Sequence, residues 1–338
     1  MDEPRVRISD IAEELGLSTA TVSNVLHGKT KKISDETVKR VMSCIEERQY
    51  LPGVAELLMA QNAAKIVGVF LNDHEKYGGH TLEDAFIASS LNALSAEIER
   101  SGRFMMVKRA KDAEEIIRFA AMWNMDGIVT IGFCEQDYAV LRSRMRIPFV
   151  VYDGFCDSTE RICNLTLDDR DGGAQVGRHL RELGHRRALC VADNETGVDR
   201  QRFAGFCAGF APGEAALLRI PMEKAARWAF YRQELPRLRA VTAVFAVSDH
   251  YAMDLICFLH SVGIAVPEAI SVAGFDDIPL CESFCPTLTT VRQPMALRAR
   301  LALEKLDELR VHRDAGETLR LPVTLVARES TAEARKEN

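Results

Sequence analysis

The feature that most constrains the fold is an alternation of short apolar runs with longer amphipathic segments, which begins near Lys65. Apolar runs of this length are typical of buried strands, here 66–71, 103–108, 127–133, 148–153, 186–193, 242–247 and 269–277. Between them the sequence predicts helices over 82–100, 113–123, a stretch ending at 183, a stretch ending at 209, 223–238 and a stretch starting at 249, with a link over 156–168. Strands separated by helices form parallel sheets with right-handed crossovers, and this region is long enough for two sheets. We therefore expect an α/β region of two lobes, with helices on both faces of each parallel sheet.

Polar side chains accompany the ends of several predicted strands. Two lobes would bring the carboxyl ends of their strands to a shared cleft, and ligands bind at those ends in open parallel sheets. Asp153, Arg202 and Asp276 fall at or just after such ends, whereas Asp249 is expected to cap its helix. A carboxylate or a guanidinium can hold two adjacent hydroxyl groups at once. These residue types therefore favour a polyhydroxylated small molecule in the cleft.

Residues 8–28 predict a different kind of unit, two short helices joined by a tight turn. Ser9 or Asp10 can cap the first helix. Gly16 can end it, because glycine tolerates positive φ, and Ser18 can cap the second helix. Small or polar side chains face outward there, which suits base edges in the major groove of double-stranded DNA. The expected DNA contacts are Ser18, Thr19, Ala20, Thr21, Ser23, Asn24, His27 and Lys29. The alternative is an ordinary helical hairpin with a solvated face.

A third helix is expected from Ser34 to about Gln49, and it would complete a small three-helix core. The side chains that face inward at helical spacing are Val38, Val41, Met42 and Ile45. Lys39 and Arg40 can contact phosphates, which adds salt-dependent affinity without sequence preference.

Composition limits the classes of function. The net charge is −6 and the pI about 5.8, so no global basic field indicates a nucleic-acid partner, and any basic surface must be local. The sequence shows neither an apolar leader after MDEPRVR nor a run of about 18 apolar residues, so we expect neither export nor a membrane span. Nine cysteines without a C-x-x-C pair are typical of reduced thiols in the cytoplasm. Phosphate-loop, dinucleotide, zinc-protease and serine-hydrolase motifs are missing, and we expect no cofactor and no metal.

The hairpin with its T-A-T-V-S segment, the Tyr50-Leu51-Pro52 break and the short segment after it resemble the lactose/galactose repressor (LacI/GalR) family in order and spacing. Similar segments follow in the family's order, namely LGHRRALCVAD, RQRFAGF, TAVFAVSDHYAMD, ISVAGFDDIPLCESFCPTLTTVRQP and LPVTLVAREST. The resemblance covers nearly the whole chain. It implies a helix-turn-helix domain joined to two lobes that are similar to periplasmic sugar-binding proteins.

The resemblance also implies a domain plan: a DNA-binding domain at 1–50, a hinge at 51–64, an effector-binding and dimerisation domain at 65–331 with lobe crossovers near 162–165, 290–293 and 321–323, and a disordered tail at 332–338. In the family the hinge folds on operator DNA and inserts a leucine into the minor groove. Tyr50, Leu58 and Met59 are the implied DNA contacts of this segment. Gly53, Glu56 and Met59 depart from the family's pattern.

The effector contacts that the resemblance implies are Asn72, Asp153, Arg202, Ser248, Asp276 and Gln293. Ser248 stands where the family commonly has asparagine, and Gly154 stands where an arginine often follows the aspartate. Losing two long polar side chains predicts an altered or larger pocket.

Three weaker patterns have ordinary alternatives. Asp73, His74 and His80 could suggest a metal site, but their spacing is not that of a defined ligand set. Cys281 and Cys285 could form a redox pair or be unrelated thiols. The aromatic side chains that could stack on a sugar ring, or simply belong to the core, are Trp123, Phe133, Phe155 and Trp228.

The sequence therefore predicts a cytoplasmic, homodimeric transcription regulator, a repressor by resemblance, that binds a near-palindromic operator. Its affinity for DNA would respond to a small molecule, a carbohydrate or a derivative of one. One alternative is a solute-binding or sensor module without DNA binding, and another is an enzyme that acts on a sugar. Adjacent side chains on an extended segment point opposite ways, so Asp276 and Asp277 are not expected to form a catalytic pair.

Overall fold

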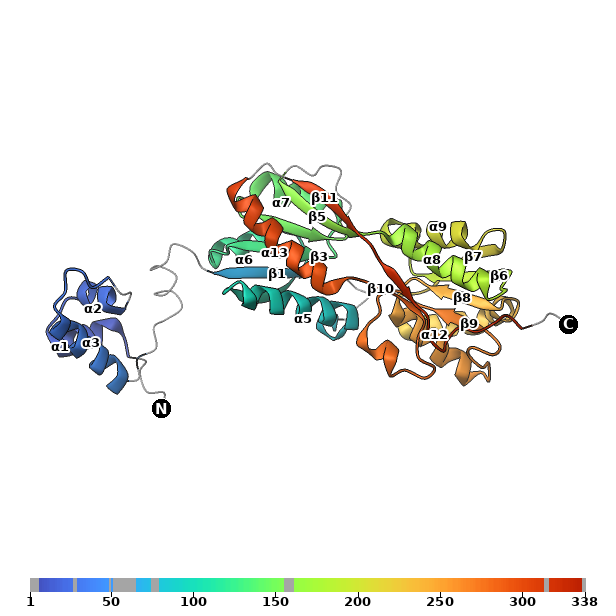
Figure 1. The fold of residues 1–338 in the computed structure, drawn as a ribbon, viewed down its shortest axis with the longest axis horizontal. Helices are drawn as coiled ribbons and strands as arrows, with labels where there is room; N and C mark the ends of the chain where they lie inside the picture. Colours follow the sequence, from blue (N-terminus) through green and yellow to red (C-terminus); the bar gives the residue numbers. More distant parts are fainter. Residues whose placement is uncertain are drawn as a thin grey trace. The chain divides into compact units, whose positions relative to one another are not determined.

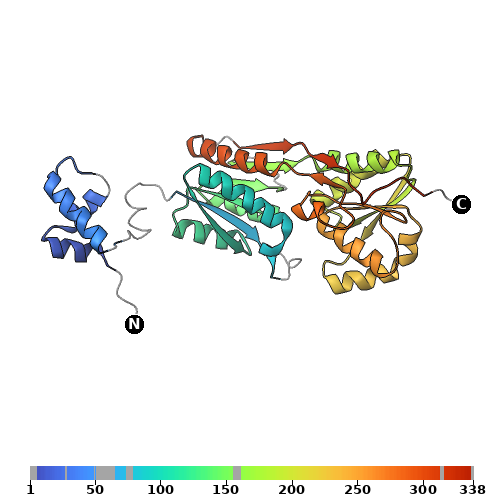
Figure 2. The ribbon, with the colours of Figure 1, turned by 60° about the horizontal axis from the view of Figure 1, so that its bottom comes forward.

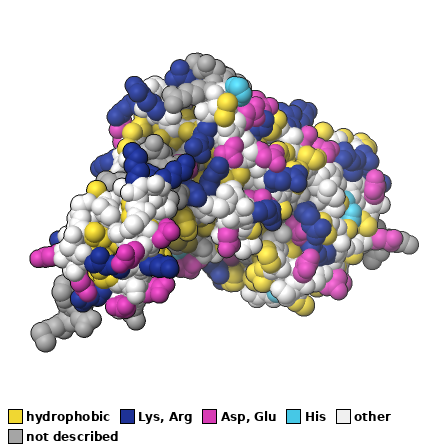
Figure 3. All heavy atoms as spheres, turned by 60° about the vertical axis from the view of Figure 1, so that its left-hand side comes forward, with side chains coloured by type: hydrophobic (Ala, Val, Ile, Leu, Met, Phe, Trp, Pro, Cys, Tyr) yellow, Lys and Arg dark blue, Asp and Glu magenta, His cyan; other side chains and the backbone are white. Residues whose placement is uncertain are grey.

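The computed structural model describes residues 6–26, 29–48, 50, 65–73, 79–154, 161–312 and 316–335. Contacts within the chain divide it into two compact units, residues 1–65 and residues 66–338. Figures 1 and 2 show helices alone in the first unit, and two sheets flanked by helices in the second. None of the helices in the described ranges is long and apolar enough to cross a membrane. Acidic and basic side chains are interspersed over the face shown in Figure 3, in keeping with the modest net charge.

The N-terminal unit packs three helices, α1 (Ile8–Leu15), α2 (Thr19–Leu26) and α3 (Asp35–Glu47). Gly16 ends α1 with φ 63°, as expected for a residue without a Cβ atom. The hydroxyl of Ser34 accepts the amide of Thr37 at 3.2 Å and caps α3. The buried core of this unit consists of Ile11, Ala12, Val22, Val25, Val41, Cys44, Ile45 and Tyr50.

Two predictions about this unit were wrong. Arg7, not Ser9 or Asp10, is the N-cap of α1, and the Asp10 carboxylate accepts the Arg7 amide at 2.8 Å from inside the helix. Met42 is 43% exposed, while Cys44 takes the inner face of α3. The reason is the helical repeat: positions three and four after Val41 share its face, whereas the next residue lies about 100° away.

The larger unit contains a six-stranded parallel sheet in the order β11-β5-β4-β3-β1-β2, which we call the N-lobe with its helices. Its elements are β1 (Ile66–Asn72), η2 (Thr81–Glu83), α5 (Ala85–Arg100), β2 (Phe104–Ala110), α6 (Ala113–Met122), β3 (Gly127–Ile131), α7 (Glu135–Arg144), β4 (Phe149–Tyr152), β5 (Ile162–Leu167), α13 (Met295–Val311) and β11 (Glu317–Leu321). Val67, Val69 and Leu71 of β1 belong to one cluster with side chains of α5 and α13. On the opposite face, Phe70 meets Phe119 of α6 with ring centroids 6.1 Å apart. Helices therefore cover both faces of the sheet.

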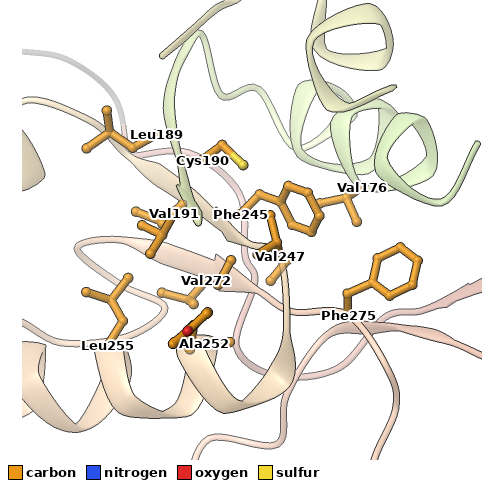
Figure 4. Close-up of a cluster of buried hydrophobic side chains, with 14 of the residues drawn as sticks. Val176, Leu189, Cys190, Val191, Phe245, Val247, Ala252, Leu255, Val272 and Phe275 are labelled. Atoms are coloured by element: carbon orange, nitrogen blue, oxygen red, sulfur yellow. The ribbon is translucent and has the colours of Figure 1, made fainter. Parts of the chain in front are cut away.

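A four-stranded parallel sheet in the order β7-β6-β8-β9 forms the second lobe, the C-lobe. Its elements are α8 (Asp169–Glu182), β6 (Arg187–Ala192), α9 (Gly197–Phe210), β7 (Glu214–Arg219), α10 (Lys224–Gln233), α11 (Leu235–Arg239), β8 (Ala243–Ala246), α12 (Asp249–Ser261), β9 (Ser271–Ala273) and η3 (Pro279–Glu282). Figure 4 shows Phe245 of β8 on the side of Val176 from α8, while Val272 of β9 lies toward Ala252 and Leu255 of α12. The predicted α/β class with helices on both faces of parallel sheets is confirmed.

The lobes are joined by three passages of the chain. The first leads from β5 to α8, the second from β10 (Thr290–Arg292) to α13, and the third from β11 to β12 (Thr324–Val326). β10 and β12 form a short antiparallel pair, which the sequence did not predict. The link expected over residues 156–168 instead contains β5, and the elements α7, β7, α13 and β11 were also missed.

The C-terminal segment was expected to be disordered from 332 onward, but hydrogen bonds hold its first residues. The amide of Ala334 donates to the Leu183 carbonyl at 2.8 Å, and the His185 ring lies 3.1 Å from the Ala332 carbonyl oxygen. Residues 332–335 therefore pack on the C-lobe, and residues 336–338 lie outside the described residues.

Helices α8 and α9 pack so closely that glycine is required where they meet. A Cβ atom on Gly205 would lie 1.8 Å from the Arg170 carbonyl oxygen, and one on Gly173 would lie 2.0 Å from the Arg202 carbonyl oxygen. Both distances are far inside van der Waals contact and involve backbone atoms, which cannot swing away as a side chain can. This approach places α9 against the first turn of α8.

We expect Gly205→Ala to lower the free energy of unfolding of the larger unit by about 2 kcal/mol. Overpacking costs roughly 1–3 kcal/mol or more and exceeds the roughly 1 kcal/mol that alanine gains over glycine within a helix. Trp123 and Trp228 are the only tryptophans and both lie in this unit, so a urea titration followed by tryptophan fluorescence reports on it. Ala204→Ser, at an exposed position of α9, is the control and should change stability by less than about 0.5 kcal/mol. Equal stability of the two variants would contradict the close helix packing.

Candidate functional site

The second helix of the N-terminal unit has one buried and one exposed side. Val22 and Val25 are buried in the three-helix core, and this orientation leaves Thr19, Ala20 and Asn24 exposed. Exposed short side chains on one side of such a helix can approach base edges without steric conflict. These three positions fit the predicted DNA-contacting surface best.

Of the other described DNA-contact candidates near this helix, three are hydrogen-bonded within the helix or half-buried, and one is exposed. The Ser18 hydroxyl accepts the amide of Thr21 at 3.1 Å and lies 2.8 Å from the Thr21 hydroxyl, so both groups stabilise the first turn of α2. Thr21 and Ser23 are half-buried, whereas Lys29 is exposed. Ser18 caps α2 as predicted.

Tyr50, which the sequence predicted to contact DNA, lies in the core of the three-helix unit. It is only 6% exposed and packs in the three-helix core, so we correct the expectation that it lies on the DNA-facing surface. Arg40, expected near phosphates, donates to the carbonyl of Leu15 at 3.2 Å and supports the end of α1. Three further DNA-contact candidates lie outside the described residues, namely His27, Leu58 and Met59, as does the hinge at 51–64.

The predicted effector residues come from both lobes. Asn72 is the last residue of β1 and Asp153 follows β4, at the carboxyl edge of the N-lobe sheet. In the C-lobe, Ser248 follows β8 and Asp276 follows β9. The chain thus supplies polar groups from the carboxyl ends of strands in both sheets, where open parallel sheets bind ligands.

Arg202 is the centre of a buried polar cluster in the C-lobe. Its Nε donates to Asp169 Oδ1 at 2.8 Å, and its Nη1 donates to the Val247 carbonyl at 2.6 Å. Its Nη1 also lies 3.7 Å from Asp276 Oδ1, and the guanidinium stacks 3.6 Å from the centroid of the Phe275 ring. The start of α8, the end of β8 and the segment after β9 therefore converge on one side chain of α9.

Asp276 and Gln293 complete this cluster. The Gln293 amide donates to Asp276 Oδ1 at 2.6 Å, and both residues are less than 10% exposed. Within the described part of the chain, Gln293 Oε1 is buried without a hydrogen-bond partner. A buried acceptor without a donor is costly, and it indicates a group that a ligand can satisfy.

Burial shapes the charge of the cluster. Burial raises the pKa of Asp276 well above its ordinary value, although Arg202 lowers it in part. For Arg202, burial lowers the pKa, but Asp169 and Asp276 together raise it more, and the net shift is upward. The guanidinium therefore remains charged, while ionised Asp276 is unfavourable in the folded protein.

Two of the predicted carboxylates lie on strained backbone. Asp153 has φ 54° and Asp276 has φ 128°, both in the region that non-glycine residues rarely occupy. Strain of this kind costs on the order of 1–3 kcal/mol and concentrates at ligand sites. It supports Asp153 and Asp276 as functional rather than merely solvated positions.

Asp153 is paired with an arginine of α13 within the N-lobe. Its carboxylate lies 2.6 Å from Nη2 of Arg298, a fully buried residue of α13. The same nitrogen donates to the Leu165 carbonyl of β5 at 2.6 Å, and the guanidinium stacks 4.0 Å from the Tyr152 ring centroid. Arg298 therefore joins β4, β5 and α13 at the cleft edge of the N-lobe.

Ser248 and Asp249 differ from expectation. Ser248 is the N-cap of α12 and accepts the Tyr251 amide at 3.3 Å, so its hydroxyl is already engaged. Asp249, expected to be that cap, is the first residue of the helix. Its carboxylate accepts from the Ile278 amide at 3.0 Å and from the Thr290 hydroxyl, so it holds the segment after β9 in place.

A cavity of about 720 Å³ lies between the β5–β11 edge of the N-lobe and helices α8 and α9. Asp153 and Asp169 line it, together with Arg170, Gln201 and Arg320. Its volume suits a small molecule. Of the six predicted effector residues only Asp153 lines this cavity, and Arg202, whose carboxylate partner Asp169 lines it, does not.

Most of the weaker candidates for metal, redox or sugar-stacking sites have an ordinary structural role. Among the described residues no group of three or more His, Cys, Asp or Glu side chains could hold a metal ion. Cys281 is buried against Asp249, whereas Cys285 is exposed, and both are free thiols. Trp228 donates to Asp254 at 2.9 Å inside the C-lobe core. The Asp73 carboxylate pairs with Arg109 and accepts from the Thr81 hydroxyl. Trp123 packs on Phe119, and Phe133 is buried. His74 and Phe155 lie outside the described residues.

Asp169 and Arg298 are site residues that the sequence did not predict. Asp169 follows Asp168, which caps α8, and two adjacent acids at a helix start have an ordinary interpretation as capping residues. Arg298 lies on α13, which was not predicted at all. Asp169 lies two residues after β5, but that strand was itself expected to be a link, so the strand-end position of Asp169 was not recognisable.

Comparison with known proteins gives the same division of the chain. Residues 7–53 match the family model described as bacterial regulatory proteins, lacI family, and residues 178–331 match a periplasmic binding protein-like domain. The chain is 28% identical to the HTH-type transcriptional repressor PurR of Erwinia tasmaniensis over 96% of this chain and 97% of the relative. It is 26% identical to PurR of Escherichia coli O139:H28, with the same coverage.

Solved structures share the fold over the whole chain. A lac repressor dimer bound to operator and the anti-inducer ONPF superposes with a TM-score of 0.80 at 22% identity, covering 97% of this chain and 99% of that one. A complex of the transcriptional regulator CelR with cellobiose has a TM-score of 0.69 at 23% identity, covering 96% and 100%. The two domain matches, the full-length relatives and the common fold confirm the resemblance seen in the sequence. The chain thus carries a lacI-family regulatory domain at residues 7–53 and a periplasmic binding protein-like domain at residues 178–331, and it is similar over its whole length to PurR repressors.

Proposed function

We propose that this lacI-family chain is a transcriptional repressor that binds operator DNA as a homodimer and is controlled by a small molecule between its lobes. The observation that carries the proposal is the combination, in one chain, of a capped helix with an exposed polar side and a two-lobed unit with a buried, incompletely satisfied polar cluster. The full-length relatives named as repressors support the same function.

The physical requirements of each half support the proposal. One three-helix unit contacts too little DNA for strong discrimination, whereas two units related by a two-fold axis can bind a near-palindromic site. A ligand that touches Asp153 in the N-lobe and Arg202 or Asp276 in the C-lobe would bind one lobe arrangement better than another. Differential affinity of this kind shifts the population of states and thereby the affinity for DNA.

The same observations favour this proposal over the alternatives. The repressors among its relatives argue against an enzyme, and Asp276 and Asp277 do not form a catalytic pair. The Asp277 carboxylate instead lies 2.5 Å from Arg292 and 2.7 Å from Arg328. A sensor without DNA binding would not need the exposed polar side of α2. A DNA-binding role places the protein in the cytoplasm with its operator.

Selection from a random duplex pool should enrich a near-palindromic sequence, and Asn24→Ala should weaken binding to it by about tenfold or more. A good side-chain contact with a base is worth roughly 1–3 kcal/mol, which corresponds to this loss. The measurement is a gel shift at fixed salt concentration, because phosphate contacts make the affinity depend on salt.

Ser43→Ala is the matched control for Asn24→Ala, since Ser43 is exposed on α3 of the same unit. It should leave the affinity for the selected sequence unchanged. Failure to enrich any sequence would refute DNA binding, and equal losses in both variants would remove Asn24 from the interface.

For the effector site, Asp276→Asn should abolish the response of DNA binding to whichever ligand a thermal-shift screen of sugars and sugar derivatives identifies. The neighbouring variant Asp277→Asn is the control, because Asp277 pairs with Arg292 and Arg328 and should affect stability without affecting the response. Both variants should still shift operator DNA in the absence of ligand. An unchanged ligand response in Asp276→Asn would remove Asp276 from the site.

The same substitution should have a pH-dependent effect on stability. Burial raises the folded-state pKa of Asp276 above its unfolded value, so the folded protein holds that proton more tightly and loses stability as pH rises above roughly 4. Asp276→Asn removes this loss. The melting temperature of the variant minus that of the natural chain should therefore increase from pH 5 to pH 8, measured by differential scanning calorimetry. A difference that is constant or decreases with pH would be inconsistent with a buried ionisable group.

A further inference from the structure

We propose that the chain has a second ligand site, on the outer side of helices α8 and α9, and that this site binds a small phosphate ester. The site is separate from the polar cluster around Arg202 and goes beyond the proposed repressor function. The observation behind it is a cavity that is lined by two arginines without an acidic partner.

The proposed site is a cavity of about 460 Å³ at the start of α9, which we call the small cavity. The residues that line it are Arg170, Thr196, Gly197, Arg200, Gln201 and Ala204. None of these six residues is acidic. The volume lies within the range of small-molecule sites. Size and composition therefore suit a small anion-bearing ligand.

The close packing of α8 on α9 brings the two arginines to one place. A Cβ atom on Gly205 would lie 1.8 Å from the Arg170 carbonyl oxygen, so the backbone of Arg170 rests on α9. Arg200 and Gln201 lie about one turn before Gly205 on that helix, and their side chains are exposed, as is that of Arg170. Arg202 is buried and lines neither cavity, which separates the small cavity from the interlobe cluster.

The charge of Arg170 is not compensated by its acidic neighbours in sequence. Asp169 lies 2.8 Å from Nε of Arg202. Asp171 lies 3.3 Å from Nη2 of Arg178. Within the described part of the chain, Arg170 itself forms no ion pair. Its guanidinium is therefore available to a ligand.

The same holds for Arg200, which forms no ion pair with any of the described residues. Its acidic neighbours Glu195 and Asp199 line neither cavity. The Asp199 carboxylate instead accepts from the Asn194 amide at 2.8 Å. Two uncompensated guanidinium groups at one cavity attract an anion.

The cavity of about 720 Å³ described above adjoins the small cavity, because both are lined by Arg170 and Gln201. It offers the hydroxyl groups of Thr166 and Thr318 and the exposed guanidinium of Arg320. Four carboxylates also line it, and each is engaged within the chain, three with an arginine and one with an amide at the start of α8. The anionic group therefore belongs in the small cavity, and the polar body of the ligand can extend into the larger one.

The number of donors and charges favours phosphate over carboxylate. A phosphate ester carries a charge of about −1.5 to −2 at pH 7 and three strong acceptor oxygens. Two arginines supply two positive charges, and each presents several N–H donors in a planar arrangement that fits phosphate. A carboxylate offers only one charge and two oxygens. The N-terminus of α9 adds partial positive charge of the same sign, although it would not define a site by itself.

The first test compares four probes on the full chain by calorimetric titration, namely glycerol phosphate, inorganic phosphate, acetate and glycerol. The titrations should be made at about pH 7.5, where the ester is mostly dianionic, and at constant ionic strength, because salt screens exposed charges. Glycerol phosphate should bind at least as tightly as inorganic phosphate and at least tenfold more tightly than acetate, and glycerol should not bind detectably. Absent binding of the ester, tighter binding of inorganic phosphate, or equal binding of acetate would overturn the proposal.

The second test locates the site with charge-removing variants. Arg170→Gln and Arg200→Gln should each weaken the binding of glycerol phosphate by about tenfold or more, the loss expected of a charge-assisted hydrogen bond. The double variant should not bind the ester detectably. Arg239→Gln removes the same charge from an exposed position of α11 that lines neither cavity, and it should change the affinity by less than about twofold. Ester binding that persists in the double variant, or that decreases equally in Arg239→Gln, would contradict the site.

A third variant tests the small cavity without removing an arginine. Ala204→Glu places a carboxylate beside the two guanidinium groups and should abolish ester binding. Ala229→Glu, at an exposed position of α10, is the matched control and should leave binding unchanged. Both positions are exposed, so both variants should keep the melting temperature of the natural chain within a few degrees. Equal affinity of the two variants for the ester would overturn the assignment.

These titrations contain no DNA, and every substituted residue lies outside the interlobe cluster. A chain that binds operator DNA but not glycerol phosphate would refute the second site and leave the repressor function intact. A chain that binds the ester through Arg170 and Arg200 but selects no DNA sequence would do the reverse.

Discussion

The buried guanidinium of Arg202 is the interaction on which the arrangement of the C-lobe site depends. It contacts the first residue of α8, the end of β8 and the segment after β9, while itself belonging to α9. A charge buried to this degree is tolerated only when partners satisfy it, so the four segments must be placed accurately. The glycines between α8 and α9 make this possible, because Gly173 and Gly205 allow the helix that carries Arg202 to approach the helix that carries Asp169. The polar cluster therefore depends on the close packing of α8 against α9.

A similar arrangement in the N-lobe explains how a ligand could affect the whole unit. Arg298 lies at the start of α13, directly after the second passage between the lobes, and it bonds to β5, which leads into the first. Its partner Asp153 stands on strained backbone at the edge of the sheet. A ligand that contacts Asp153 and Asp276 would therefore act on residues adjacent to two passages at once. Small changes there alter the relation of two rigid sheets, since packed cores do not deform continuously.

The sequence predicted those elements whose burial leaves a clear pattern. β1, β3, β4 and β8 are buried along nearly their whole length, as central parallel strands are, and they were recognised as apolar runs. β7 and β11 lie at sheet edges and bury few residues, so they lack such a run. β5 was taken for a link because Asn164 interrupts its apolar residues. That side chain forms two hydrogen bonds with the Gly154 backbone, which is a tertiary requirement that no local pattern reveals.

The candidate site was predictable to the extent that strand ends define it. Asp153 directly follows β4 and Asp276 lies three residues after β9, so topology alone places them near the ligand-binding edge. Asp169 and Arg298 acquire their roles from partners 33 and 133 residues away in sequence, a separation at which spacing carries no information. Asp249 was expected to cap its own helix, but its carboxylate accepts a hydrogen bond from Thr290, 41 residues later. Sequence spacing could not reveal this partner either. Residue type and strand order therefore favour a polar ligand here, but which carboxylates share Arg202 follows only from the tertiary structure.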